Sequence, residues 1–296
     1  MRSVRLPAFA KVNLCLHVLG RRADGYHELR TVFQAISLHD TLELTLRGTG
    51  GIELETTDPD LPAGQDNLAW RAMDALRREL RIRQGVRARL VKRIPVGRGL
   101  GGGSSDAAAA LQGILRLTGK KLPEARLLEL AASLGADVPF FLQGGRALGV
   151  GRGDEIYPLP DLPRRAIVVV SPRDIAVRTR EAYRWLGRQL TKRGQASKLW
   201  SFCALCWSPQ GAGTSNDFEA VVFRRHPRLR RIKRELLERG AAEAALAGSG
   251  SAVFGVFRSP AQARRAAQGF PKDQVFVCNT LSRGEYRRVH SGRGGI

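Results

Sequence analysis

A glycine-rich run within residues 95–111 has the composition of a loop that binds phosphate. Five of the seven residues from 97 to 103 are glycine, and Ser-Ser-Asp follows at 104–106. Glycine packs nothing and loses more backbone freedom on folding than other residues, so this cluster suits a chain that bends sharply beside another molecule. Alanines at 107–110 and a glycine at 119 predict a helix directly after it, with Ser-Ser-Asp as N-cap. The unpaired amides and positive dipole end of such a helix bind anions, most naturally phosphate.

Three known types of glycine loop do not match this run. A Walker A loop needs a lysine where Gly103 stands. Gly97, Gly99 and Gly102 satisfy the dinucleotide pattern, but the preceding segment 86–92 alternates instead of forming a continuous apolar strand. The H-R-D and D-F-G motifs of protein kinases do not occur in the sequence. A plain turn between strand and helix remains the alternative, although such a turn needs only one or two glycines.

Two charged residues stand among apolar neighbours and could do chemistry. Lys11 lies between Phe9-Ala10 and Val12, so it is either a charge on an edge strand or a functional ammonium. Asp137 precedes Val-Pro-Phe-Phe, where an ionised carboxylate without a partner is costly. A turn or capping role is the alternative for this aspartate.

The N-terminal half predicts a sheet with helices. Segment 4–19 alternates and is rich in valine and leucine, as expected of one long strand or a strand pair. Loop composition at 20–28 precedes further predicted strands at 29–38, 40–46 and 52–56. Two further helices are expected, one capped by Asp66-Asn67 and running from Leu68 to Leu80, the other at 123–134.

Prolines at 158, 160 and 163 mark a predicted domain boundary. The order beyond them is strand, helix, strand, strand, helix, strand, with extra helices inserted; the six segments are 166–170, 179–190, 241–246, 252–257, 260–268 and 275–278. That order is typical of a ferredoxin-like split βαβ domain, whereas the polar stretch 191–214 allows no prediction. We therefore predict an α+β chain of two domains, 1–162 and 163–296.

Composition sets the class of the protein. The chain has 296 residues, of which 43% are hydrophobic, and no apolar run approaches twenty residues. With no signal-peptide pattern at the N-terminus, we expect a cytoplasmic protein without a membrane partner. Four cysteines, with Cys203-Ala-Leu-Cys206 as a lone C-x-x-C, favour neither a disulfide framework nor a zinc site.

The net charge of +22 raises the question of a polyanionic partner. The densest basic run, 224–234, contains no aromatic residue, and the leucine and isoleucine spacing up to Leu237 predicts one amphipathic helix with a basic outer face. Basic residues also recur along the whole chain rather than in one patch. We favour a solvated surface and expect no nucleic-acid partner, with RNA or DNA binding as the alternative.

The motifs taken together resemble those of the GHMP kinases. Pro95-x-x-x-Gly99-Leu100-Gly101-x-Gly103-Ser104-Ser105 is similar to their phosphate loop. The segments 10–14, 20–29 and 135–141 resemble one branch, the kinases of the non-mevalonate isoprenoid pathway whose substrate is 4-diphosphocytidyl-2-C-methyl-D-erythritol. The resemblance covers most of the chain up to about Arg283. Another GHMP small-molecule kinase, or a basic nucleic-acid-binding protein on an S5-like fold, is the alternative.

This resemblance implies a fold and a reaction. The N-terminal domain would resemble domain 2 of ribosomal protein S5, the C-terminal domain would be ferredoxin-like, and the site would lie in the cleft between them. The γ-phosphoryl group of ATP would pass to the 2-hydroxyl of the cytidyl substrate. Asp137 would take the proton of that hydroxyl, and Lys11 would keep Asp137 ionised and neutralise charge on the reacting oxygens.

The resemblance also implies the binding residues. The ATP phosphates would lie on the loop, at Pro95, Val96, Gly97, Arg98, Gly99, Leu100, Gly101, Gly102, Gly103, Ser104 and Ser105. The adenine would lie near Asn67, Leu68 and Lys92. An aromatic pair would sandwich the cytosine, a histidine would read its edge, and two polar residues would contact the substrate; these are Tyr26, Tyr183, His27, Asn13 and Thr179. A third glycine motif would close over the site at Gly248, Ser249 and Gly250.

Cofactors, partners and departures complete the expectation. ATP is the co-substrate, Mg²⁺ is implied by the family without assignable ligands, no resident metal is expected, and the chain would be a monomer or weak homodimer. Phe9 stands where the family usually has proline, Arg98 where it often has a small residue, and Arg178 where it usually has serine. Because 191–214 aligns with nothing, the Thr179 and Tyr183 assignments depend on the least supported part of the resemblance.

Overall fold

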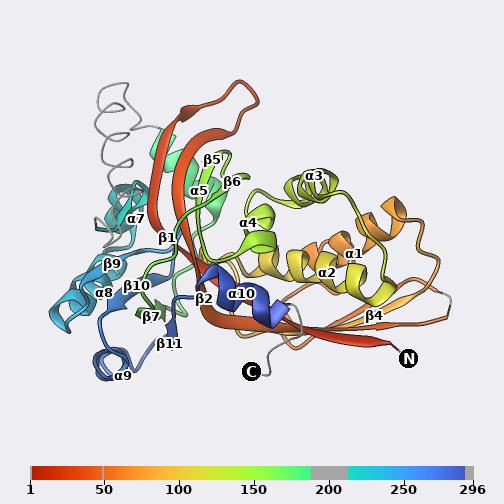
Figure 1. Cartoon of the computed structure of the whole chain (residues 1–296). Coiled ribbons are helices and arrows are strands. Elements are labelled where there is room, and N and C mark those ends of the chain that lie inside the picture. Colours follow the sequence, from red (N-terminus) through yellow and green to blue (C-terminus); the bar gives the residue numbers. More distant parts are fainter. Residues whose placement is uncertain (1, 49, 188–212, 291–296) are drawn as a thin grey trace.

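Two long antiparallel strands run through the molecule. The computed structural model describes residues 2–48, 50–187 and 213–290. Strands β1 (Ser3–Arg21) and β2 (His27–Leu46) pair along nearly their whole length and extend from one end of the molecule to the other (Figure 1). The predicted break between strands at residue 39 is wrong. Between the Phe9–His39 and Ala10–Ile36 pairs the register shifts, so residues 37 and 38 of β2 have no partner in β1; β2 continues through this irregularity without ending.

The N-terminal half is a seven-stranded sheet with helices packed on it. Its order is β3-β4-β2-β1-β8, and β2 also pairs with β5, which pairs with β6. The remaining strands are β3 (Ile52–Thr56), β4 (Val86–Val91), β5 (Arg146–Gly151), β6 (Glu155–Pro158) and β8 (Ser215–Asn216). Strand β8 is parallel to β1, so a segment from the second half of the sequence completes the first sheet.

Four helices accompany this sheet. They are α1 (Leu68–Glu79), α2 (Gly102–Thr118), α3 (Glu124–Leu134) and α4 (Val138–Gln143). Helix α2 lies against α1, β1 and β2, and its alanines at 107–110 are buried in the main hydrophobic core. Small side chains allow this close approach between α2 and the sheet. The helix ends at Gly119 in the left-handed conformation, with φ of 67°, as the sequence predicted.

The C-terminal half is a four-stranded antiparallel sheet of order β11-β7-β10-β9. Its strands are β7 (Ala166–Ser171), β9 (Glu243–Leu246), β10 (Val253–Phe257) and β11 (Gln274–Asn279). Its helices are α5 (Thr179–Gly187), α7 (Phe218–Arg225), α8 (Pro227–Glu238) and α9 (Pro260–Ala267). This is the predicted ferredoxin-like order, with the predicted extra helices between α5 and β9.

The last helix returns to the first half. Helix α10 (Arg283–His290) packs beside β1, and the hydroxyl of the buried Tyr286 donates to the carbonyl of Phe141 at 2.6 Å. Residues beyond 282 therefore contribute to the N-terminal core. The boundary between 162 and 163 stays a prediction. None of the helices in the described part of the chain has the length and apolar character that crossing a bilayer requires.

The basic run at 224–234 is two helices, so the prediction of one amphipathic helix is wrong. Helices α7 and α8 meet at His226, because Pro227 has no N–H to continue a helix and occupies the first turn of α8 instead. Several of the charges are paired within the molecule: Arg228 contacts Asp273 at 2.7 Å, and Lys233 contacts Glu219 at 2.6 Å.

Candidate active site

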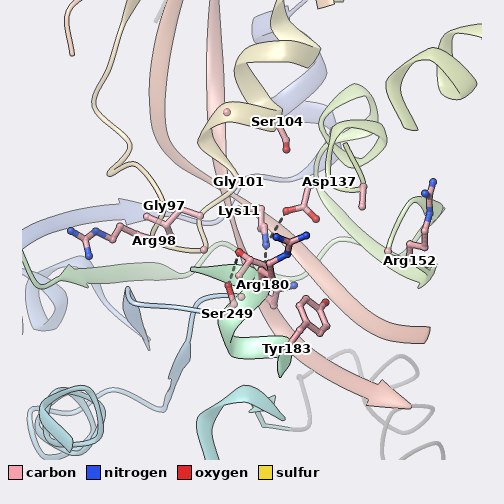
Figure 2. Close-up of a pocket in the computed structure, with 18 of the residues that line it drawn as sticks. Lys11, Gly97, Arg98, Gly101, Ser104, Asp137, Arg152, Arg180, Tyr183 and Ser249 are labelled. Atoms are coloured by element: carbon pink, nitrogen blue, oxygen red, sulfur yellow. Dashed lines mark hydrogen bonds and ion pairs between the residues drawn. The ribbon is translucent and has the colours of Figure 1, made fainter. Parts of the chain in front are cut away.

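A cleft of about 1670 Å³ lies between the two halves. The glycine loop and the start of α2 form one wall, and β1 and the residues before α4 form another (Figure 2). The first turns of α5 and the turn after β9 close it from the C-terminal half. The predicted ATP and substrate residues line this cleft, except Ser105 and Gly250, which do not. The region 188–212 adjoining α5 lies outside the described residues.

The glycine loop presents free amides at the start of α2. The N-cap is Gly101, in the left-handed conformation with φ of 74°, and no side chain caps the helix. The prediction of Ser-Ser-Asp as N-cap is wrong, because the helix begins at Gly102 and residues 104–106 already lie inside its first turns. The first-turn amides therefore face the cleft without a side-chain partner, as an anion site requires.

Two loop glycines have no room for a side chain. A Cβ at Gly99, where φ is +81°, would lie 1.9 Å from the carbonyl oxygen of Ala247. A Cβ at Gly101 would lie 2.7 Å from the Phe141 ring and 3.1 Å from Cγ of Lys11. The loop thus touches the turn after β9 on one side and the β1 and α4 residues on the other. Its shape is set by both halves of the molecule.

The structure brings Lys11 and Asp137 together. Lys11 Nζ lies 3.3 Å from Asp137 Oδ2, and the Lys11 side chain is only 5% exposed, whereas that of Asp137 is 32% exposed (Figure 2). Lys11 also donates to Asn13 Oδ1 at 2.9 Å, and Asn13 donates to Thr31 Oγ1 at 2.8 Å. The Lys11 amide donates to the carbonyl of Leu100. Asp137 sits at the N-cap position of α4 but makes no capping bond, so its carboxylate is available to the cleft.

Lys92 and Asn67 reach the cleft with their polar groups already engaged. Lys92 Nζ pairs with Asp40 and, at 2.7 Å, with Asp106. Burial raises the pKa of the Asp106 carboxyl although Lys92 lowers it. Asn67 Oδ1 accepts from the Ala69 amide at 2.9 Å and caps α1, as predicted. The adenine roles of both residues stay predictions.

The predicted base-binding residues gather at the opposite end of the cleft. His27 stacks on Tyr183 with ring centroids 4.7 Å apart, and the rings of Tyr183 and Phe218 are perpendicular with centroids 4.8 Å apart. Tyr26 is 57% exposed, and the Arg152 guanidinium lies 5.0 Å from its ring centre. One face of Tyr183 therefore meets His27 and one face of Tyr26 meets Arg152. A sandwich of cytosine between the two tyrosines stays a prediction.

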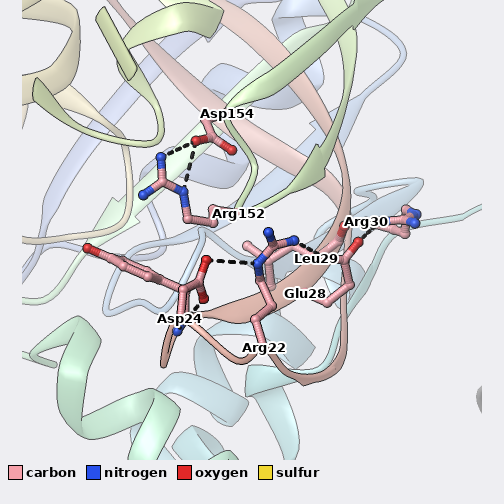
Figure 3. Close-up of polar contacts among 8 residues, drawn as sticks. Arg22, Asp24, Glu28, Leu29, Arg30, Arg152 and Asp154 are labelled. Atoms are coloured by element: carbon pink, nitrogen blue, oxygen red, sulfur yellow. Dashed lines mark hydrogen bonds and ion pairs between the residues drawn. The ribbon is translucent and has the colours of Figure 1, made fainter. Parts of the chain in front are cut away.

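Charged side chains brace the loop that carries Tyr26 (Figure 3). Arg22 pairs with Asp24 at 3.2 Å and with Glu28 at 2.6 Å, and Asp24 accepts from the Tyr26 amide at 3.0 Å. Arg152, on the neighbouring turn, is held by Asp154. This network orders an exposed loop by several linked contacts rather than by one.

His27 and Tyr183 carry opposite pKa shifts. Burial, with a smaller contribution from Arg21, lowers the pKa of His27, so its ring is neutral at neutral pH. Burial and the nearby charge of Asp137 raise the pKa of Tyr183, which keeps its hydroxyl protonated. A neutral imidazole donates from one nitrogen and accepts at the other, which suits it to reading a base edge.

Four arginines line the cleft that sequence reasoning missed: Arg21, Arg152, Arg180 and Arg184. The side chain of Arg180 points from the start of α5 toward Asp137 (Figure 2). Among the described residues, no acid forms an ion pair with Arg180. Arginine is common throughout this chain, so its residue type alone does not mark Arg180 as a cleft residue. The sequence marks it only by its position next to the predicted substrate residue Thr179. A cleft with several cations suits a ligand with several negative charges.

Comparisons with known proteins agree with this geometry. The model of the GHMP kinases N terminal domain matches residues 67–145, and that of the GHMP kinases C terminal domain matches residues 201–274. A protein of Solibacter usitatus (strain Ellin6076) named 4-diphosphocytidyl-2-C-methyl-D-erythritol kinase is 47% identical, covering 97% of this chain and 92% of the relative. One of the same name from Geobacter sulfurreducens is 42% identical over 90% of this chain and 95% of the relative.

Solved structures show the same relationship. A crystal structure of 4-(cytidine 5'-diphospho)-2C-methyl-D-erythritol kinase superposes with a TM-score of 0.77 and 36% identity, covering 94% of this chain and 99% of that one. A homoserine kinase from Cytophaga hutchinsonii shares the fold, with a TM-score of 0.70 at 21% identity over 95% of each chain.

The fold, the free amides of the glycine loop and the two matching domain models define a kinase of the GHMP class. Within that class, the sequence identity of 47% and 42% to the two relatives, along nearly their whole length, indicates which family of GHMP kinases the chain belongs to. The chain belongs to the 4-diphosphocytidyl-2-C-methyl-D-erythritol kinase family.

Proposed function

We propose that this chain transfers the γ-phosphoryl group of ATP to the 2-hydroxyl of 4-diphosphocytidyl-2-C-methyl-D-erythritol. The observation that carries the proposal is the Lys11–Asp137 contact of 3.3 Å, placed in one cleft with the free amides of α2. The two residues are far apart in sequence, and only the fold brings them to the place where a phosphate tail would dock.

The chemistry assigned to the pair is proton removal and charge stabilisation. The Asp137 carboxylate accepts the proton of the attacking hydroxyl, whose oxygen then bonds to the γ-phosphorus as the bond to ADP breaks. Lys11 stabilises the negative charge on the reacting oxygens from a buried position, where electrostatic interactions are stronger than in water. The α2 amides hold the ATP phosphates in line with that attack.

The residues present fit a Mg²⁺ ion that arrives with ATP. The described residues contain no group of three or more His, Cys, Asp or Glu that could form a metal cage. Mg²⁺ in kinase sites is held largely by substrate phosphates and water, with one or two protein oxygens. Ser104 and Asp137 offer such oxygens in the cleft. The ion would supply charge neutralisation on the phosphates.

The opposite end of the cleft supplies recognition of the cytidine diphosphate. His27, neutral at neutral pH, and the aromatic faces of Tyr26 and Tyr183 provide a polar edge reader and stacking surfaces. Arg152 and Arg180 supply positive charge for the diphosphate. The reaction consumes ATP, and we place it in the cytoplasm.

The direct test is acceptor choice. We expect ADP release and phosphorylated product, followed by a coupled assay and by mass spectrometry, with the cytidyl substrate and not with mevalonate or homoserine. Turnover with mevalonate or homoserine alone would overturn the acceptor assignment and retain the kinase class. No ATP consumption with any acceptor, together with salt-sensitive RNA binding, would overturn the proposed function entirely.

A further inference from the structure

The side chain of Arg98 joins the phosphate loop to the C-terminal half. Its Nη1 donates to the hydroxyl of Ser251 at 2.9 Å, and its Nη2 donates to the carbonyl of Arg173 at 3.3 Å. Figure 2 shows the guanidinium pointing away from Lys11 and Asp137, so it lies outside the place of proton transfer. The Arg98 carbonyl accepts from the amide of Ala252, which adds a backbone contact between the same two segments.

Ser251 is the buried partner that makes this contact specific. It is 0% exposed, and its hydroxyl donates to the carbonyl of Ile175 at 2.5 Å. A hydroxyl has a single hydrogen, so with that hydrogen engaged its oxygen accepts from Arg98. The Ser251 hydroxyl thus has a partner for its hydrogen and one for its oxygen, and removing the Arg98 side chain leaves that buried oxygen without its donor.

The turn 248–251, which contains Ser251, also contacts helix α5, on the side of the cleft where the proposed function places the acceptor. Thr179 Oγ1, at the start of α5, lies 3.0 Å from the hydroxyl of Ser249. The carbonyls of Arg173 and Ile175 belong to the connection that leads from β7 into α5. Arg98 is therefore connected to α5 by two routes, through the 248–251 turn and through the 172–178 connection.

The phosphate loop needs such a contact because its backbone is intrinsically free. Five glycines within 97–103 make its ordered shape entropically expensive. Close packing of Gly99 against Ala247 places the loop, but a van der Waals contact has little directionality. Two hydrogen bonds from one rigid planar guanidinium fix both the position and the orientation of the loop at Arg98.

We propose that Arg98 is a positioning residue that holds the phosphate loop against the C-terminal half and thereby couples ATP binding to acceptor binding. The inference rests on the proposed function, since it assigns the acceptor to the α5 side of the cleft. Phosphoryl transfer depends chiefly on alignment, so loosening this contact misaligns ATP with an otherwise intact pair of Lys11 and Asp137.

A double-mutant cycle tests the proposal. Arg98→Ala and Ser251→Ala, alone and together, are compared by kcat/KM for ATP at saturating acceptor. We expect each single variant to lose about tenfold and the double variant to lose clearly less than the product of the two, because the Arg98–Ser251 bond is already absent from both single variants while only the bonds to Arg173 and Ile175 are lost independently. Arg173→Ala is the matched control: Arg98 uses only the backbone carbonyl of Arg173, so kcat/KM should stay near wild type. Additive losses, with the double variant about 100-fold down, would overturn the proposal.

Binding measurements separate positioning from direct phosphate contact. The affinity for a non-hydrolysable ATP analogue is measured with and without the cytidyl substrate. We expect the acceptor to tighten analogue binding in wild type and Arg173→Ala, and to do so much less in Arg98→Ala. An Arg98→Ala protein that loses analogue affinity equally with and without acceptor would contradict the coupling.

Folding and function are checked separately. Arg98→Gln retains a side chain with N–H donors but no charge, so partial recovery relative to Arg98→Ala is expected in a protein with a wild-type thermal melt. If Arg98→Ala does not fold, Arg98→Gln and Ser251→Ala complete the comparison. Failure of wild type to phosphorylate the cytidyl substrate counts against the proposed function, whereas additivity in a functional enzyme counts against Arg98 alone.

Discussion

Lys11 lies with its ammonium 3.3 Å from the Asp137 carboxylate, and a strand from the start of the chain thereby meets the first residue before α4. The cation is almost completely buried, while the carboxylate retains access to the cleft. A buried ammonium is costly unless it is paired, and here Asp137 and Asn13 are its partners. The contact therefore stabilises the buried ammonium of Lys11 and also leaves the Asp137 carboxylate accessible to a substrate in the cleft.

Replacing Lys11 by methionine should keep the shape and remove the charge. We expect kcat to fall by about 100-fold or more, because one stabilising group for the reacting oxygens is lost. Binding of an ATP analogue, measured by calorimetry, should fall far less, since the α2 amides remain. A Lys11→Met enzyme that folds normally and turns over at the wild-type rate would contradict the role of this ammonium.

The two glycines Gly97 and Gly99 form a matched pair for substitution. Both have positive φ, of 68° and 81°, so alanine costs each roughly 1–2 kcal/mol of backbone strain. Only at Gly99 does a Cβ meet backbone, 1.9 Å from the Ala247 carbonyl oxygen, whereas nothing lies within 4 Å at Gly97. We expect Gly99→Ala to raise the KM for ATP at least about tenfold more than Gly97→Ala. Equal effects in steady-state kinetics would mean that the close contact with Ala247 is unimportant.

Lys92 should prove structural rather than catalytic. Its ammonium contacts the carboxyl groups of both Asp40 and Asp106, and all three side chains are at most 6% exposed. Lys92→Met would leave two buried acids without a cation and should lower the free energy of unfolding by about 3–5 kcal/mol. Urea denaturation measures this change. The exposed pair of Arg87 and Glu55 gives the control, because Arg87→Met should cost under about 1 kcal/mol.

Because of His17, the stability of the folded protein should decrease as the pH rises into the alkaline range. Burial lowers its pKa, but hydrogen bonds with Asp217 and Cys15 outweigh this and raise the pKa from 6.5 to about 9. Because the folded pKa is the higher one, the protonated ring stabilises the fold fully below about pH 6.5. That stabilisation, at most roughly 3 kcal/mol, is lost as the pH rises through about 9.

Thermal melts between pH 6 and 10 check this expectation. The melting temperature of the wild type should fall over that interval, and that of His17→Gln should fall less. His39→Gln, a substitution elsewhere on the β1–β2 pair, should keep the wild-type dependence. A wild-type profile as flat as that of His17→Gln would contradict the assignment.

Local patterns in the sequence predicted the parts of the fold that depend on local physics. The alternation of 4–19 indicated the long strand β1, and the alanines after the glycine run indicated α2. The start of α2 was placed wrongly because Ser-Ser-Asp is a strong capping sequence. Gly101 takes the cap instead, since only a residue without a side chain fits beside Phe141 and Lys11.

The contacts that sequence reasoning did not find are long-range pairings of common residues. Arginine occurs throughout this basic chain, so nothing in the sequence marks Arg98 as the partner of Ser251 or Arg180 as a residue of the cleft. Lys92 likewise carries no signal that its charge is neutralised by Asp40 and Asp106. Such pairings follow from the packing of the two halves and not from the neighbours of each residue.

The role of Asp137 is the central claim, and a single-turnover experiment tests it most directly. Asp137→Asn preserves size and removes the base. With enzyme in excess over radiolabelled ATP and saturating cytidyl substrate, phosphoryl transfer should slow by about 1,000-fold relative to wild type, while ATP affinity stays within about threefold. Transfer by Asp137→Asn at a rate within about tenfold of wild type would show that this carboxylate is not the base.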